Sequence, residues 1–415
     1  MELRRSALLW NYAGVLIGVC VFVVAAPLAF RQASSYDGLT MERVAVGLAE
    51  HLDPLVRQEP DQFKLNTPYS SYGLGSSVIM APLHLVGRAV GADSQRSMNL
   101  ADALMVGATA AVVFATLRRR GVSPRFATVT TLVVIVGSPL LAYAVTDFSE
   151  PGVALMVALV VLGLDGVSRQ ARFAALGVGA AIGGAVLFRT DSILLLAAPV
   201  GIALWVLSRR RSRDLTLYAL GATPFLAIWV WYNVARFDHP FAGGYRNQGF
   251  THSFLSGAYG LAFSPGRGVF VYAPVLIVAF VVVPSLRGTD RTLAILAIAL
   301  LVARVVFYAR WWSWYGGSIW GPRFLAPVIP AFAPAIAVAL QRWRTSVWLA
   351  AVVVTGLAMS VLGVWLTTHP ERNPYFVTVP PNRDTGKEMM AEFTDPAYVR
   401  HIDHTMFDWS VFPLR

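Results

Sequence analysis

The chain has 415 residues, of which 56% are hydrophobic and only 14% are charged. A soluble domain carries about 25% charged residues, so this composition excludes an ordinary soluble enzyme. The formal net charge of +11 does not indicate nucleic-acid binding, because the arginines gather in short loops between apolar runs, where they orient helices in a membrane.

Apolar runs of about twenty residues, the length that crosses a bilayer core, recur along the chain. They do not alternate apolar and polar residues, so they predict helices and not the strands of a barrel. The first run is too long for a typical signal peptide, so we expect it to be retained as the first helix. It contains Cys20, the single cysteine, which excludes a disulfide within the chain. We therefore expect an all-α, polytopic transmembrane bundle of about eleven spans, near residues 8–30, 98–117, 126–145, 152–167, 173–189, 192–208, 216–235, 269–285, 292–309, 324–340 and 345–366.

Arginine clusters indicate the topology, because positive residues are retained on the cytoplasmic side. All of them fall on one side of the predicted spans: Arg4–Arg5, Arg118–Arg120 with Arg125, Arg169 and Arg172, Arg209–Arg213, Arg287 and Arg291, and Arg342 and Arg344. The N-terminus is therefore expected in the cytoplasm and the C-terminus outside. We expect one transmembrane domain, 1–366, followed by an extracytoplasmic tail, 367–415.

The long polar loops lie on the outer side in this topology: 31–97, 146–151, 236–268, 310–323 and the tail. The first of them, 31–97, contains an amphipathic helix over 41–56 and a short apolar run over 78–90 that we expect at the membrane interface. All candidate functional residues therefore share one face of the membrane.

The first acid after the opening span is Asp37, flanked by Tyr36 and Gly38, with Glu42 close behind. A carboxylate at the rim of a membrane can act as a base on a hydroxyl group that is presented there. The alternative is that Asp37 caps a helix that starts near Leu39.

Asp147 and Glu150 lie in the second outer loop, between two spans. Two carboxylates three residues apart can bind a divalent cation, Mg or Mn, through oxygen ligands. The alternative is a helix start, with Ser149 as N-cap and Glu150 in the first turn. Metal use is therefore left open.

Arg189 and Asp191 interrupt two apolar runs, and Arg304 lies inside another. Ionisable residues near or within a membrane are functional candidates by default. An internal ion pair that fixes a hairpin is the competing interpretation of Arg189 and Asp191.

The loop 236–268 carries Arg246 and Arg267, whose guanidinium groups could hold a phosphate, since that geometry suits phosphate oxygens. Lipid headgroup contacts are the alternative. His239 lies in the same loop without metal-type spacing and indicates a polar contact.

The stretch from Arg310 to Arg323 is rich in aromatic residues, including Trp312, Trp314 and Tyr315. A belt of aromatic residues at the membrane interface would explain the rings. It would not require the glycines that follow, which let a ligand approach the backbone. A sugar-binding role, with arginines at both ends of the stretch, is favoured.

Five segments together resemble the bacterial GT-C superfamily of integral-membrane glycosyltransferases, which use polyprenyl-phosphate sugars. They are similar in pattern to the protein O-mannosyltransferases and the lipid A aminoarabinose transferases. The segments are Tyr36-Asp37-Gly38, Tyr72-Gly73-Leu74-Gly75, Phe148-Ser149-Glu150-Pro151, Ser264-Pro265-Gly266-Arg267-Gly268, and Tyr315-Gly316-Gly317 with Gly321-Pro322-Arg323. The second outer loop lacks an adjacent pair of aspartates, and no large soluble domain follows the spans.

The resemblance implies a glycosyltransferase of the bacterial plasma membrane, in which Asp37 takes the proton from an acceptor hydroxyl. That hydroxyl attacks the sugar in a single inverting displacement, and the second acidic site is Asp147 or Glu150. The residues expected to bind the donor phosphate are Arg267, Arg310, Arg323, Arg189 and Arg246, with Lys64 as a further candidate. Those expected to contact the sugar or the acceptor are Tyr36, Glu42, Tyr72, Trp312, Trp314, Tyr315 and His239.

The acceptor is left open between a lipid, a polysaccharide and a protein. The main alternative function is a transporter or flippase of a lipid-linked sugar, and a third is a non-catalytic protein of cell-envelope assembly. Transporters place polar groups deep within their spans. The predicted spans here contain few charged residues apart from Asp102 and Arg304, which favours an enzyme.

Overall fold

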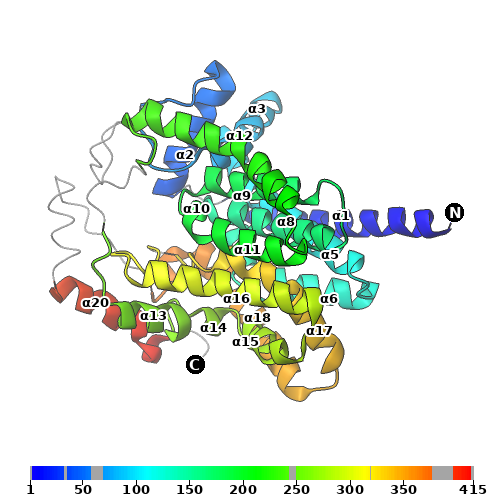
Figure 1. Ribbon diagram of the computed structural model, residues 1–415. Helices are drawn as coiled ribbons and strands as arrows, with labels where there is room; N and C mark the ends of the chain where they lie inside the picture. The colour runs from blue at the N-terminus through cyan, green and yellow to red at the C-terminus, as the bar shows by residue number, and fades with distance from the viewer. Residues whose placement is uncertain are drawn as a thin grey trace.

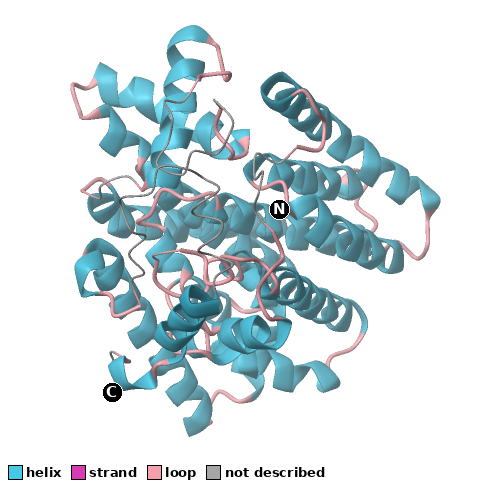
Figure 2. Ribbon diagram, turned by 90° about the vertical axis from the view of Figure 1, so that its left-hand side faces the viewer, coloured by secondary structure: helices cyan, strands magenta, loops and turns pink. Residues whose placement is uncertain are grey.

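The computed structural model describes residues 2–31, 35–57, 69–242, 249–317, 319–375 and 396–412. Regular secondary structure in these ranges is helical throughout (Figure 2), and the only strand-like pairing is an isolated bridge between Arg57 and Tyr69. The predicted all-α fold is confirmed.

The first nine helices are α1 (Glu2–Ala29), α2 (Tyr36–His51), α3 (Leu74–Ala89), α4 (Ser94–Met98), α5 (Leu100–Arg119), α6 (Pro124–Ile135), α7 (Leu140–Tyr143), α8 (Glu150–Ser168) and α9 (Ala174–Phe188). The later helices are α10 (Ser192–Leu195), α11 (Ala197–Leu207), α12 (Ser212–Phe237), α13 (Phe254–Phe263), α14 (Val269–Tyr272), α15 (Val275–Val282), α16 (Gly288–Ala309), α17 (Ala333–Arg342), α18 (Val347–Thr368) and α20 (Pro396–Phe407). Short 3-10 helices are η1 (Val283–Ser285), η2 (Ala326–Phe332), η3 (Pro370–Arg372) and η4 (Trp409–Val411).

Each predicted span falls on a helix or on a broken pair of helices, but the count of eleven is not confirmed. Within the described ranges, six helical segments are long and apolar enough to cross a membrane: α1, α4 with α5, α8, α12, α16 and α18. Prolines explain several of the breaks, because proline lacks the N–H that would continue the hydrogen-bond ladder. Pro139 follows the end of α6, Pro274 separates α14 from α15, and Pro327 lies in the 3-10 turn that precedes α17. The chain is a multi-pass membrane protein.

Helix α8 lies at the centre of the bundle, where it packs against α5, α9 and η2. Helix α9 in turn packs against α12, and α1 lies at the edge against α5 (Figure 1). Helices α13 and α20 lie together at the left-hand end in Figure 1, opposite the N-terminus.

Helices α2 and α3 are the two interfacial helices expected in the first outer loop, and they pack against each other. Helix α2 starts at Tyr36 and not near Leu39, and its N-cap is Ser35, whose side chain accepts a hydrogen bond from the Gly38 amide. The capping role considered for Asp37 is therefore wrong. Its carboxylate lies in the first turn, where the partial positive charge of the helix N-terminus favours an anion.

Candidate active site

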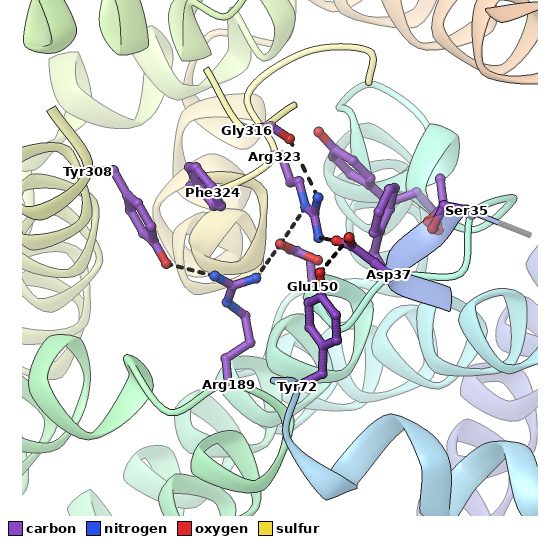
Figure 3. A network of polar contacts seen from close by, with 12 residues as sticks. Ser35, Asp37, Tyr72, Glu150, Arg189, Tyr308, Gly316, Arg323 and Phe324 are labelled. Atoms are coloured by element: carbon purple, nitrogen blue, oxygen red, sulfur yellow. Dashed lines mark hydrogen bonds and ion pairs between the residues drawn. The ribbon is translucent and has the colours of Figure 1, made fainter. Parts of the chain in front are cut away.

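Four charged side chains from four separate segments form one ion-pair network (Figure 3). The Asp37 Oδ2 atom accepts a hydrogen bond of 2.6 Å from Nη2 of Arg323. The Nε of Arg323 donates to Oε1 of Glu150 at 2.7 Å, and Nη1 of Arg189 donates to the same oxygen at 2.6 Å. All four residues come from segments predicted to face the outside.

Local structure places each member of this network. Glu150 is the first residue of α8, as its helix-start interpretation predicts, so its charge also lies at a helix N-terminus. Arg189 caps the C-terminus of α9. Arg323 follows a turn in which Gly316 and Gly321 have φ angles of 78° and 74°, a region that only glycine enters readily.

The guanidinium group of Arg323 is held on three sides. It lies 3.8 Å from the centroid of the Phe148 ring, as in a cation–π contact, and Nη1 reaches the carbonyl oxygen of Gly316 at 3.5 Å. Burial lowers the pKa of Arg323, but the Glu150 and Asp37 carboxylates outweigh this effect and hold the pKa above its ordinary value. Arg323 is therefore a fixed positive charge between two acids.

Tyr72 contacts the other oxygen of the base candidate, since its hydroxyl donates to Oδ1 of Asp37 at 2.5 Å. The backbone of Tyr72 is held in turn by Arg236 of α12, whose Nη1 donates to the Tyr72 carbonyl oxygen at 3.0 Å. The Glu150 side chain is 1% exposed and that of Asp37 is 19% exposed. Asp37 is therefore the acid of this network that a second molecule can reach.

Asp147 has a different position from Glu150, although both were candidates for the second acidic site. It accepts hydrogen bonds from the amide and the hydroxyl of Ser35, the residue that caps α2. Burial raises the pKa of Asp147 to about 6, against the opposing effect of the bonds from Ser35. A side chain at Gly38 would collide with this carboxylate, since its Cβ would lie 1.8 Å from Oδ2. Asp147 thus fixes the turn that carries Asp37.

A second layer of charge lies behind Arg189. Its Nε donates to Oδ1 of Asp191 at 3.2 Å, and its Nη2 donates to the hydroxyl of Tyr308 at 3.0 Å. Tyr308 also donates to Asp191, and its ring stacks on that of Phe324 with centroids 3.9 Å apart. Burial raises the pKa of Asp191, but Arg189 and nearby cationic and hydroxyl groups outweigh it, so the pKa is lowered.

Arg304 of α16 completes this layer. Its Nη1 donates to the carbonyl oxygen of Phe324 at 2.9 Å and lies 3.9 Å from Oδ2 of Asp191. The sequence marked Arg304 and Asp191 as ionisable residues near a membrane, but Tyr308 was missed, because no sequence signal separates it from other aromatic residues of the spans. Phe148 was named only as part of the Phe148-Ser149-Glu150-Pro151 segment and was given no role. The pair Arg189–Asp191 is the internal ion pair that was the alternative interpretation.

Two predicted phosphate ligands lie outside the network. Arg267 is fully buried and donates to the carbonyl oxygens of Tyr315 at 2.5 Å, Gly266 at 2.6 Å and Gly317 at 2.7 Å. It therefore joins two loops of the chain itself. Arg310 is exposed and reaches the carbonyl oxygen of Phe250 at 3.4 Å. Arg246, Lys64 and the side chain of Tyr36 lie outside the described residues.

The residues predicted to contact a sugar are not gathered at the network apart from Tyr72. Trp314 is buried, with its ring against His252 and Phe407, and Tyr315 is buried as well. This burial leaves neither ring a face for a sugar. The other positions are Trp312, which is partly exposed, Glu42, which is buried in α2, and His239, which is exposed and accepts a hydrogen bond from the Phe241 amide.

The two acids considered for a divalent-cation site already have partners in the structure. Glu150 is already bound to two guanidinium groups, and Asp147 is bound to the start of α2. In the described ranges, no three His, Cys, Asp or Glu side chains are grouped to hold a metal ion.

An apolar groove of about 620 Å³ lies along α9. Its walls come from α3, α8 and α9 and include Gly75, Met156, Leu159 and Phe188, and Arg119 lies at its other end. Phe188 directly precedes Arg189. Helix α9 has 15 residues, so the groove follows it for about 20 Å.

Comparisons with known proteins agree with this architecture. Residues 81–232 match the family model described as dolichyl-phosphate-mannose-protein mannosyltransferase. The crystal structure of ArnT from Cupriavidus metallidurans bound to undecaprenyl phosphate is similar at a TM-score of 0.61 and 17% identity, over 98% of this chain and 74% of that one. The same enzyme in the apo state gives a TM-score of 0.58 and 15% identity, over 97% and 78%. No curated protein sequence matches the chain.

These findings confirm the predicted resemblance to the GT-C glycosyltransferases, and the ArnT structures show the fold. The matched range 81–232 includes Glu150 and Arg189 but neither Asp37 nor Arg323. The tertiary structure brings Asp37 and Arg323 into contact with each other, and Arg323 into contact with Glu150.

Proposed function

We propose that this protein is a membrane glycosyltransferase that moves a sugar from a polyprenyl-phosphate donor to an acceptor hydroxyl. The observation that carries the proposal is the position of Asp37. This partly exposed carboxylate is held by Arg323 and Tyr72, in a fold similar to that of ArnT bound to undecaprenyl phosphate. Its network includes Arg189, the residue that follows Phe188 of the apolar groove.

The groove provides the place for the polyprenyl chain. Its apolar lining suits an isoprenoid tail, because burial of apolar surface is favourable and non-directional. The end at Phe188 brings the phosphate of such a lipid next to Arg189. The tail therefore locates the donor, and the arginines receive its head.

The guanidinium groups of Arg323 and Arg189 neutralise the phosphate as the sugar leaves it. Positive groups that are already in place stabilise developing negative charge more than mobile groups do in a site shielded from water. In the absence of donor, both arginines are bound to acids, and Glu150 holds the two together. An incoming phosphate competes for Arg323 and draws it away from Asp37.

Asp37, once released from Arg323, acts as the general base. It accepts the proton of the acceptor hydroxyl, and the oxygen attacks the anomeric carbon of the sugar. The bond between that carbon and the phosphate oxygen breaks, and polyprenyl phosphate leaves with the electron pair. A single displacement of this kind inverts the anomeric configuration. Tyr72 keeps the carboxylate oriented through its bond to Oδ1.

The topology and the partners belong to the same proposal. We place the network on the outer face of a bacterial plasma membrane, with the N-terminus in the cytoplasm. The acceptor is a hydroxyl group of a lipid, a polysaccharide or a protein. The proposal assigns no step to a metal ion.

The test is transfer by the purified protein from a panel of undecaprenyl-phosphate-linked sugars to extracts of lipid, polysaccharide and protein acceptors. Wild-type protein is expected to release undecaprenyl phosphate and to label one acceptor class. Asp37→Asn is expected to bind the donor but not to transfer. Movement of the lipid-linked sugar across a vesicle membrane, unaffected by Asp37→Asn, would instead indicate a flippase.

A further inference from the structure

The C-terminal segment, residues 396–412, packs against α13 and against the loop that carries Gly266. In Figure 1, α20 lies against α13, and the contact is polar as well as apolar. His252 Nε2 and Asp403 Oδ1 lie 3.1 Å apart, and the hydroxyl of Ser256 donates to Oδ2 of Asp403 at 2.8 Å. Asp403 thus binds two residues around the start of α13.

Backbone groups reinforce this docking. The amide of Gly266 donates to the carbonyl oxygen of Met406 at 3.0 Å, and the Tyr375 hydroxyl donates to the carbonyl oxygen of Asp408 at 3.0 Å. Met406 and Tyr375 are fully buried, and Ile402 is 3% exposed. Chain termini that only cover a surface usually fray, so this degree of burial indicates an integral part of the fold.

A single loop, residues 314–317, contacts both the C-terminal segment and Arg323. Phe407 of α20 stacks on Trp314 with centroids 5.7 Å apart. The loop that follows Trp314 supplies the carbonyl oxygen of Gly316 to Arg323, and Arg267 holds both sides of this glycine through Tyr315 and Gly317.

We propose that the C-terminal segment is a brace for the active site, and that Asp403 and His252 are positioning residues that act through the loop 314–317 on Arg323. The inference rests on the proposed function, because it assigns to the segment an effect on sugar transfer. A brace is needed here because Arg323 leaves a loop rich in glycine, which has little stiffness of its own. A displacement of about 1 Å at such a residue can cost two orders of magnitude in rate.

A reversible cross-link between positions 256 and 403, whose side chains are hydrogen-bonded, provides the test. Cysteines are placed at both positions, Ser256→Cys with Asp403→Cys, in a Cys20→Ser background that removes the single native thiol. A short bis-methanethiosulfonate reagent then joins the pair, and a reductant releases it. His404→Ala, an exposed position on the same helix, is the matched control and is expected to behave as wild type.

The unlinked double variant is expected to lose turnover by a factor of about 10 to 100, while the KM for the acceptor stays within about twofold. Linking should return turnover to within about threefold of wild type, and Asp403→Asn, which keeps most hydrogen bonds, should lose less than the double variant. The inference is overturned if the unlinked variant turns over like wild type. It is also overturned if the link restores the melting temperature but not the turnover, because that separates stability from positioning.

A binding measurement separates this inference from the proposed function. The affinity for undecaprenyl phosphate alone should fall on opening the link and recover on closing it, because Arg323 receives the phosphate. If wild type binds this lipid but transfers no sugar from any donor, the proposed function fails while the brace is still tested by binding. Equal affinity in the open and closed states would refute the brace.

Discussion

Helix α8 carries a buried acid near each end, and each acid is bound by two arginines. At the N-terminal end of α8 Glu150 binds Arg189 and Arg323, and at the C-terminal end Asp165 binds Arg120 and Arg169. Both carboxylates are 1% exposed. Burial and charge pairing are therefore the same at the two ends, and they cannot by themselves identify a functional site.

The surroundings of the two acids differ. Arg169 lies one turn from Asp165 on the same helix, and Arg120 also binds Asp290 in the first turn of α16. That cluster fastens neighbouring loops. The Glu150 cluster adds Asp37, a partly exposed carboxylate with a tyrosine partner. Asp290 of the Asp165 cluster is 40% exposed, so exposure alone does not separate the two clusters. The Tyr72 hydroxyl, which binds and orients the Asp37 carboxylate, is the feature that separates them.

The largest effect is expected at Asp37. Asp37→Asn keeps the shape and one hydrogen-bond acceptor but removes the base, so kcat should fall by about 10³–10⁴. The affinity for undecaprenyl phosphate should be unchanged or tighter, because Arg323 loses a competing charge. Transfer assays and lipid-binding titrations on the same preparation check both statements, and substantial residual turnover would remove Asp37 from its role.

At the other end, Arg120→Gln should affect stability and not turnover. Loss of this guanidinium weakens the pairing of buried Asp165 and of Asp290, so the free energy of unfolding should fall by about 3 kcal/mol. Equilibrium denaturation in mixed micelles measures this loss. Turnover per folded molecule should match wild type, and a fall in it would mean that the two ends are not functionally distinct.

Arg323→Lys tests whether residue 323 must bind two carboxylates at once. Lysine keeps the charge but cannot bind Glu150 and Asp37 in the forked geometry of a guanidinium group. We expect a fall in kcat/KM for the donor of about 10²-fold. Arg310→Lys, an exposed arginine outside the network, is the control, and an equal loss there would argue against the assignment.

The smallest effect concerns the pH dependence that Asp147 imposes. Its pKa of about 6 lies above the ordinary value of 3.8, so the folded state binds this proton more tightly than the unfolded state. The resulting stabilisation is present below about pH 4 and is lost as the pH rises through 6. Asp147→Asn cannot lose a proton, so its stability relative to wild type should improve by on the order of 2 kcal/mol between pH 4 and pH 7. A constant difference across this range would contradict the assignment.

The sequence predicted the positions of the helices well, because membrane-spanning helices appear in it as apolar runs separated by loops that contain arginine. It did not predict where they break, since prolines such as Pro274 divide runs that look continuous in hydropathy. It also brought Asp37, Glu150, Arg189 and Arg323 into the same list of candidates.

Distinguishing these residues from Arg267 was beyond the sequence. Both Arg267 and Arg323 follow glycine-rich turns, but Arg267 is directed to carbonyl groups and Arg323 to carboxylates. That difference depends on which distant loops meet in three dimensions. For the same reason Trp314 was predicted to bind a sugar, whereas α20 covers it.

A structure of the protein with undecaprenyl phosphate bound tests the central claim most directly. The account predicts that the phosphate lies within hydrogen-bond distance of Arg323 and Arg189, that the Asp37–Arg323 pair is open, and that the isoprenoid chain follows α8 and α9. A phosphate held by Arg267 or Arg310, with the Asp37–Arg323 pair intact, would contradict it.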